Sequence, residues 1–114
     1  MNTLREMQKA IYANNVAKGW HEGAFTTTPE AVSTKIMLVV TELAEAVEEM
    51  RNGHPYDKVY FSSNKPEGFG IELADAVIRL LDIAEHLGID MQDAVTLKHN
   101  FNTTRPYRHG GKKI

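Results

Sequence analysis

Two pairs of carboxylates are the residues of this chain whose types and spacing could do chemistry. Glu42 and Glu45 stand three positions apart, and so do Glu72 and Asp75. In a helix, residues three apart lie over the same turn, so each pair presents both carboxylates on one face. If the two helices pack antiparallel, four carboxylates face one another across the interface. Such a set suits a hard divalent cation, Mg²⁺ or Mn²⁺, which prefers oxygen ligands.

The second pair belongs to a segment with strongly apolar surroundings. Residues 71–87 are apolar around most of a helical wheel, which is typical of a helix buried in a core or an assembly. All their polar residues except Glu85 nevertheless form one stripe, made of Glu72, Asp75, Arg79, Asp82 and His86. Buried charges are costly unless they are paired or bind a metal. We therefore expect Glu72 and Asp75 to be ligands, and Arg79 and Asp82 to form ion pairs or hydrogen bonds that orient their neighbours.

The first pair is less informative by itself. Acidic residues are common on solvated helix faces, so Glu42 and Glu45 alone are as compatible with an ordinary surface as with a metal site. Histidine-containing di-iron sites of helical bundles use Glu-x-x-His, and no histidine of the chain has Glu three residues before it. The combination of both acidic pairs, not either one, predicts the site.

A row of polar and basic residues could complement these carboxylates. Lys98, Asn102 and Arg105 are spaced i, i+4 and i+7, so they share one face if the helix continues that far. Lysine, an amide and arginine together suit a polyphosphate. Taken alone, the row is more simply a solvated basic helix end, which the helix dipole favours. Beside a metal site, the row would neutralise the part of the phosphate charge that the metal does not neutralise.

An aromatic loop precedes the first acidic pair. Trp20 and Phe25 could stack on a nucleobase, and Asn14 and Asn15 on the preceding helix could read a base edge or be plain surface. The alternative is a tryptophan that only closes the end of a bundle.

Four helices are predicted to position these residues. Thr28 and Pro29 mark one helix start, and Gly19 and Gly88 mark two helix ends. The segment around Tyr60 is predicted as a short strand or an ordered loop, and the tail after residue 106 as irregular. The predicted helices span about 2–18, 28–50, 66–87 and 90–102. This pattern predicts an all-α four-helix bundle.

Length and composition limit the classes of function. The 114 residues fit a single domain, 1–114, with a formal net charge of -2 and no cysteine. Nothing global suggests a nucleic-acid or membrane partner, and no signal peptide or spanning segment is evident, so we expect a cytoplasmic protein. The apolar faces of the first two helices exceed what one small bundle can cover. We therefore expect a homodimer or homotetramer, whose active sites two chains could share.

The order of these motifs resembles that of the MazG-like family, the all-α nucleoside triphosphate pyrophosphohydrolases. The acidic pairs match the family's ExxE and ExxD motifs, and Lys98, Asn102 and Arg105 match its phosphate-binding row. Residues 65–90, KPEGFGIELADAVIRLLDIAEHLGID, and the RPYRHGGKK tail are similar to small stand-alone members. One departure is Thr41, which stands where the family often has a further acid, so the number of bound ions is left open.

The resemblance implies metal-dependent hydrolysis of an NTP or dNTP between the α- and β-phosphates, giving a nucleoside monophosphate and pyrophosphate. Glu42, Glu45, Glu72 and Asp75 would hold Mg²⁺, with Glu45 orienting the attacking water, while Lys98 and Arg105 stabilise the departing pyrophosphate. Trp20 and Asn14 would contact the base. Two alternatives remain: a non-catalytic helical interaction module with an acidic stripe, and a related hydrolase of diphosphates or a modified nucleotide. The sequence does not indicate base or sugar preference.

Overall fold

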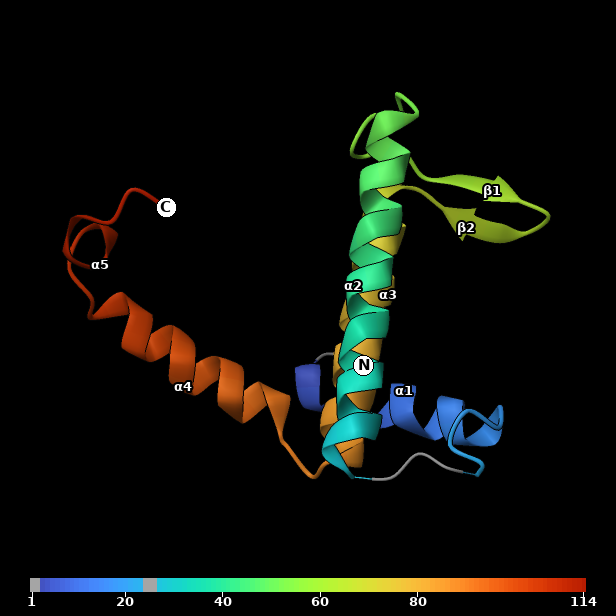
Figure 1. The fold of residues 1–114 in the computed structure, drawn as a ribbon, viewed down its shortest axis with the longest axis horizontal. Coiled ribbons are helices and arrows are strands. Elements are labelled where there is room, and N and C mark those ends of the chain that lie inside the picture. Colours follow the sequence, from blue (N-terminus) through green and yellow to red (C-terminus); the bar gives the residue numbers. More distant parts are fainter. Residues whose placement is uncertain (1–2, 24–26) are drawn as a thin grey trace.

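The chain is mostly helical, as predicted for an all-α protein. The computed structural model describes residues 3–23 and 27–114. Its elements, in chain order, are helices α1 (Leu4–Ala17) and α2 (Pro29–Arg51), strands β1 (Tyr60–Ser62) and β2 (Lys65–Glu67), and helices α3 (Phe69–His86), α4 (Met91–Thr103) and α5 (Arg108–Gly111) (Figure 1).

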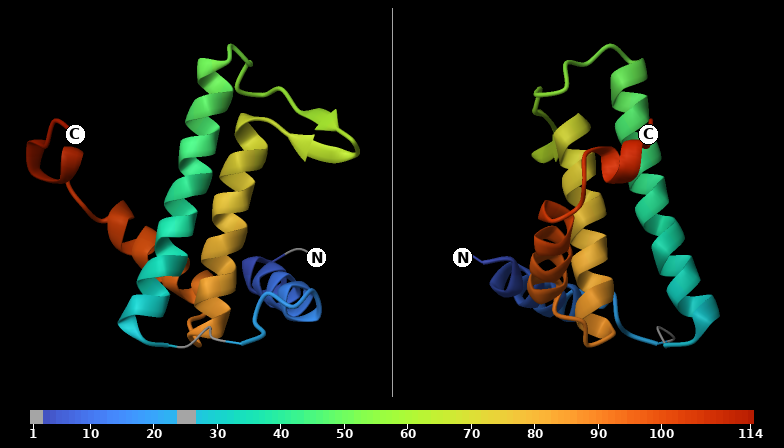
Figure 2. Two further views of the ribbon diagram at one scale, coloured as in Figure 1. Left: turned by 45° about the vertical axis from the view of Figure 1, so that its right-hand side comes forward. Right: turned by 90° about the vertical axis from the view of Figure 1, so that its left-hand side faces the viewer.

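Helices α2 and α3 form an antiparallel pair at the centre of the molecule (Figure 2). The Thr28 hydroxyl caps α2 by accepting a hydrogen bond from the Ala31 amide at 3.3 Å, as the sequence predicts. The core cluster between the helices consists of Val39, Ala76 and Ile83. Because this core is narrow, one face of each helix stays open to carry polar side chains.

Helix α1 lies across the end of α3 and fixes the corner between α3 and α4. Gln8 is fully buried, and its Nε2 donates to Glu85 Oε1 at 2.9 Å and to the Ile89 carbonyl at 2.7 Å. Its Oε1 accepts from the Met91 amide at 3.1 Å. Arg5 adds an ion pair with Glu85, with Nη1 and Oε1 2.7 Å apart. These bonds hold the start of α4 against α1, so they set the direction in which α4 leaves.

A two-stranded hairpin precedes α3, which therefore starts later than predicted. Helix α3 begins at Phe69 and not near residue 66, because Lys65–Glu67 pairs antiparallel with Tyr60–Ser62. The turn residues Ser63 and Asn64 have φ of 50° and 70°, as in a type I′ hairpin turn. Gly68 then makes the transition to the helix.

Gly68 occupies a backbone position that a side chain would not fit. Its φ is 138°, and a Cβ built there would collide with the carbonyl oxygen of Lys58. Only glycine adopts this conformation readily and also allows so close an approach of backbone. The position therefore fixes how the hairpin joins α3.

Helix α4 projects from the molecule as an arm, and its main contact is with α1 (Figures 1 and 2). A single chain therefore does not close into the predicted four-helix bundle. The tail forms a short turn, α5, in which Arg108 and His109 have left-handed φ of 50° and 51°.

Much apolar surface is left uncovered. Among the described residues, six hydrophobic side chains are buried, while large apolar side chains are exposed along three helices: Ile36, Met37, Val40, Leu43, Val47 and Met50 on α2, Leu73, Val77 and Leu80 on α3, and Val95, Leu97 and Phe101 on α4. None of the described helices is long and apolar enough to cross a membrane.

Candidate metal centre and adjoining groove

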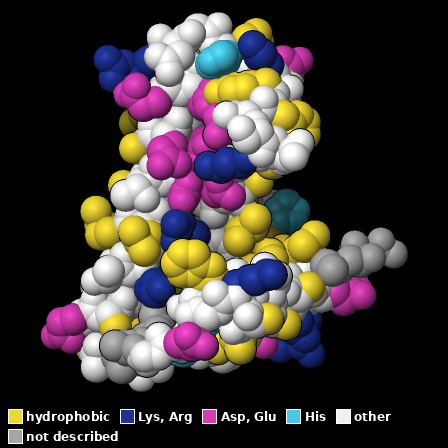
Figure 3. All heavy atoms as spheres, turned by 90° about the vertical axis from the view of Figure 1, so that its right-hand side faces the viewer, with side chains coloured by type: hydrophobic (Ala, Val, Ile, Leu, Met, Phe, Trp, Pro, Cys, Tyr) yellow, Lys and Arg dark blue, Asp and Glu magenta, His cyan; other side chains and the backbone are white. Residues whose placement is uncertain are grey.

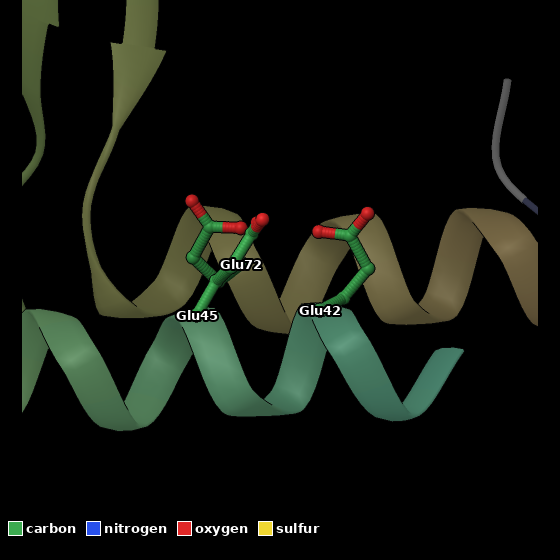
Figure 4. A group of neighbouring side chains, drawn as sticks. All are labelled: Glu42, Glu45 and Glu72. Atoms are coloured by element: carbon green, nitrogen blue, oxygen red, sulfur yellow. The ribbon is translucent and has the colours of Figure 1, made fainter. Parts of the chain in front are cut away.

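Three carboxylates from the central helix pair converge on one point. Glu42 and Glu45 of α2 and Glu72 of α3 each place an oxygen within 4.8 Å of the others. Figure 4 shows all three side chains pointing toward the same side, the side from which the hairpin rises. The antiparallel pairing of the helices brings the two acidic motifs together, as predicted from their spacing.

Glu72 is the most strongly perturbed of the three. Its Oε2 atom is buried and has no hydrogen-bond partner among the described residues. Burial, together with a hydrogen bond to Glu45 and the charges of Glu45 and Asp75, raises the pKa of Glu72 from 4.5 to about 7. A cation at this point would give the buried oxygen a partner and relieve the repulsion. The donor set is all oxygen, which fits Mg²⁺ or Mn²⁺.

Glu42 is held in its charged form by an arginine. The residue is 8 % exposed, and Arg79 Nε donates to its Oε1 at 2.8 Å. Burial alone would raise the pKa of Glu42, but the hydrogen bond from Arg79, a hydrogen bond shared with Glu45 and the Arg79 charge lower it overall. Arg79 thus forms the ion pair that the sequence analysis expected of it.

Asp75 lies beside this group and is not one of the three converging carboxylates. Burial and the charge of Glu42 raise the pKa of Asp75, and the charges of Arg79 and Lys65 act against this rise. Lys65 belongs to β2, so the hairpin brings a cation toward the site. Figure 3 shows Asp and Glu side chains gathered in the middle of this face, with Lys and Arg side chains beside them.

A hydrogen bond fastens the base of the hairpin to α2 near the site. The Tyr60 hydroxyl donates to Glu49, with distances of 2.7 Å to Oε1 and 2.9 Å to Oε2. This bond raises the pKa of Tyr60 to about 12, so the hydroxyl keeps its proton at physiological pH. The tyrosine therefore anchors the hairpin and is not available as a base.

A groove of about 300 Å³ runs from the carboxylates along the helix pair. Helices α1, α2 and α3 and the loop after α1 contribute to it. Its lining residues are Asn15, Trp20, Lys35, Glu42, Asp75, Ile78, Arg79, Asp82 and Ile83. The groove thus joins an acidic end, two cations and an aromatic wall, which is a combination that suits a phosphorylated aromatic ligand.

Asp82 ties the aromatic loop to the groove. One of its oxygens, Oδ1, is 2.8 Å from His21 Nε2 and accepts a hydrogen bond from Asn15 Nδ2 at 3.0 Å. His21 also stacks on His86, with ring centroids 5.3 Å apart. Because His21 follows Trp20 directly, these contacts hold the tryptophan at the edge of the groove. Asp82 therefore makes the orienting hydrogen bonds expected of it.

The predicted base-contacting residues divide into two groups. Trp20 lines the groove and is 70 % exposed. Asn14 is exposed and does not line it, whereas its neighbour Asn15 does. The reason is helical geometry: Gln8, Tyr12 and Asn15 lie on the face of α1 that contacts α3, and the next residue along a helix points about 100° away. Phe25 lies outside the described residues.

The predicted phosphate-binding row lies away from the carboxylates, with Lys98 and Asn102 on α4 and Arg105 just beyond the helix end at Thr103. The Lys98 Nζ and Arg105 Cζ atoms are 4.8 Å and 5.6 Å from the centroid of the Phe101 ring, so the two cations flank this ring. Lys98 and Asn102 line a second, shallow hollow on α4. Helix α4 leaves on the side opposite the hairpin, whereas the carboxylates point toward the hairpin side (Figures 1 and 4). A single chain does not bring the two sets together.

Lys35 is the groove residue that the sequence analysis missed. It stands seven positions before Glu42, which places both on one face of α2. That spacing is a signal in the sequence, but a lone lysine on a long helix is ordinarily a solvated residue.

Comparison with known proteins adds no assignment. The chain matches no protein-family model, no curated protein and no solved structure.

Proposed function

We propose that this protein is a metal-dependent nucleoside triphosphate pyrophosphohydrolase of the MazG-like type. It would cleave an NTP or dNTP between the α- and β-phosphates and release the nucleoside monophosphate and pyrophosphate. The observation that carries the proposal is the convergence of Glu42, Glu45 and Glu72, with a buried and unpartnered Glu72 oxygen, at the end of a groove walled by Trp20.

Four residues are assigned to the metal. Glu42, Glu45 and Glu72 would be ligands, and Asp75 beside them would be the fourth. Thr41 has no carboxylate to add, and its hydroxyl donates to the Leu38 carbonyl at 2.6 Å. A Mg²⁺ or Mn²⁺ ion held there would offset phosphate charge and make a nearby water molecule more acidic.

The protein's own groups would do the remaining work. Glu45 is the exposed member of the three carboxylates, so it can accept a proton from a water molecule that attacks the α-phosphorus. The bond from the α-phosphorus to the bridging oxygen breaks, and pyrophosphate leaves with that oxygen. Glu42, fixed by Arg79, keeps its charge throughout.

Lys98, Asn102 and Arg105 are assigned to the site of a neighbouring copy. Helix α4 is held in its outward direction by the bonds of Gln8, so it does not fold back on its own carboxylates. The exposed apolar faces of α2, α3 and α4 support a homodimer or homotetramer, since surfaces of this extent are normally covered. In such an assembly the row would stabilise charge on the departing pyrophosphate.

Turnover of nucleotides by Glu72→Gln and Asp75→Asn tests the proposal, with Glu48→Gln as the matched control. Glu48 lies on α2, the helix that carries Glu42 and Glu45, but it is exposed and paired with Arg51. We expect the first two variants to lose at least about 100-fold in kcat, since even outer partners of metal ligands cost 10–100-fold. The control should keep wild-type turnover. Full activity in both test variants would exclude the metal site.

Absence of any turnover would favour a different function. A salt-sensitive complex with a basic protein would then indicate the interaction module, and turnover restricted to diphosphates or a modified nucleotide would indicate the related hydrolase.

A further inference from the structure

The middle of the groove carries two cations that face it from opposite helices. Lys35 comes from α2 and Arg79 from α3, and both line the groove between the carboxylates and Trp20. Arg79 donates to Glu42 and lies near enough to Asp75 for its charge to affect that residue, and Lys35 lines the same groove as Asp82. Both cations therefore belong to a groove that also carries acidic groups.

Arg79 is placed to bind a ligand while it holds Glu42. The hydrogen bond to Glu42 uses Nε, and the side chain is 40 % exposed. The Nη1 and Nη2 groups of a guanidinium carry further donors in a fixed fork, which matches the oxygens of a phosphate. Arg79 can therefore bridge a metal-binding carboxylate and a phosphate.

Lys35 defines the position of a second charge along the groove. It precedes Glu42 by seven residues, or about 10 Å along the helix axis. The start of α2 lies beside the end of α3 in the antiparallel pair, so Lys35 lies toward the part of α3 that carries Asp82 and His86 (Figure 2). Its charge accordingly contributes to the lowered pKa of His86, after burial and the charge of His21. Lys35 is thus closer to the aromatic wall than the three converging carboxylates are.

Trp20 supplies an aromatic surface at that same end. The residue is 70 % exposed, yet the loop that carries it is fastened through His21 to Asp82. A fixed and exposed indole beside a cation offers a stacking surface for a ring that carries a phosphate nearby.

We propose that Lys35 and Arg79 bind the α-phosphate of the nucleotide, whose base stacks on Trp20. The substrate then binds in a single orientation, in which the nucleoside lies toward α1 and the pyrophosphate part of the substrate lies over the carboxylates and the hairpin. This inference rests on the proposed function and adds the orientation of the substrate and two residues that neither motif includes. It predicts that the two halves of the substrate respond differently to loss of Lys35.

Binding experiments with the two halves of the substrate test the orientation. Trp20 is the only tryptophan of the chain, so its fluorescence reports ligands in the groove. With Mg²⁺ present, the wild type is titrated with the α,β-imido analogues of the standard NTPs and dNTPs, and then with the monophosphate of the best binder. Magnesium pyrophosphate is titrated separately by calorimetry.

We expect Lys35→Met to weaken binding of the triphosphate analogue and the monophosphate by about tenfold or more, and to change pyrophosphate binding less than twofold. Arg79→Lys, which keeps a charge near Glu42, should weaken the same two ligands. Lys9→Met, an exposed cation on α1, is the control and should bind all ligands as the wild type does. Circular dichroism and melting of each variant establish that it is folded.

Three results would overturn the inference: no fluorescence response to any analogue at millimolar concentration, unchanged monophosphate binding in folded Lys35→Met, or an equal loss of pyrophosphate binding. The proposed function is judged separately by turnover. Wild-type turnover with no effect of Lys35→Met would refute the inference alone. A Lys35-dependent monophosphate site without any turnover would refute the function alone.

Discussion

Glu72 should make the metal-free protein less stable as the pH rises. Its pKa is 4.5 in an unperturbed carboxyl and about 7 in the folded protein. Between these values the folded chain binds more protons than the unfolded chain does. The free energy of unfolding therefore falls as the pH rises through this window, and the loss is nearly complete about one unit above the folded pKa, near pH 8. Replacement of Glu72 by Gln removes the titrating group and should remove this part of the decline.

The size of the effect follows from the change in pKa. A rise from 4.5 to about 7 corresponds to at most about 3.5 kcal/mol, at about 1.4 kcal/mol per pH unit. Glu72 is partly exposed and Glu45 can move, so solvent screening should reduce the observed effect to about 1–2 kcal/mol. For a domain of this size that corresponds to roughly 4–8 °C in Tm.

Thermal unfolding by circular dichroism measures this effect. Wild type and Glu72→Gln are compared in EDTA from pH 5 to pH 8, at one protein concentration because an oligomer's Tm depends on it. Asp75 and His86 also have shifted pKa values, so the difference between the two proteins, not either curve, isolates Glu72. We expect equal stability near pH 5 and a more stable variant at pH 8.

Mg²⁺ should reverse this order. At pH 8 it should raise the Tm of the wild type, because a cation relieves the repulsion among the carboxylates, and it should have little effect on Glu72→Gln. Two outcomes would refute this account of Glu72 as a carboxylate that destabilises the metal-free protein and is stabilised by a cation. One is a variant less stable than the wild type in EDTA at pH 8, and the other is a stability difference that does not change with pH.

Three further predictions follow from other parts of the fold. Gly68→Ala should lower the free energy of unfolding by about 2 kcal/mol or more, because its Cβ would strike the Lys58 carbonyl at a φ of 138°. In the same urea titration, Gly70→Ala should be neutral or stabilising, because Gly70 lies in a helix with open space around it. Asp82→Asn should lower turnover less than Asp75→Asn does, and the change should be mainly in KM, because Asp82 holds the loop that carries Trp20. An equal loss of kcat would instead indicate that Asp82 is a metal ligand. Light scattering at micromolar concentration should give a dimer or tetramer, and a monomer would contradict the shared site.

Local signals in the sequence were enough to predict most helix boundaries. The capping hydroxyl of Thr28 and the positive φ of Gly19 and Gly88 act within one turn, so they can be read from neighbouring residues. The start of α3 could not be read in this way. Lys65–Glu67 resembles a helix start, but pairing with Tyr60–Ser62 makes it a strand.

In the candidate site, too, the spacing of neighbouring residues could be read from the sequence, whereas features that depend on contacts between helices could not. The approach of Glu42, Glu45 and Glu72 followed from two i, i+3 spacings and an antiparallel pair. The choice between Asn14 and Asn15 depended on which face of α1 meets α3, because the amphipathic pattern does not fix the rotation of the helix to one residue.

The direction of α4 depended on contacts far apart in the sequence. Gln8 bonds the Ile89 carbonyl and the Met91 amide, more than 80 residues further along the chain. No periodicity in α4 itself encodes this corner. The spacing of Lys98, Asn102 and Arg105 therefore predicted a shared face but not the site that this face serves.

The central claim is tested most directly by incubating the purified protein with each standard NTP and dNTP, in Mg²⁺ and in EDTA, and resolving the products. We predict a nucleoside monophosphate and pyrophosphate in equal amounts, only with Mg²⁺. No turnover with Mg²⁺ or Mn²⁺, or release of a nucleoside diphosphate and inorganic phosphate, would contradict it.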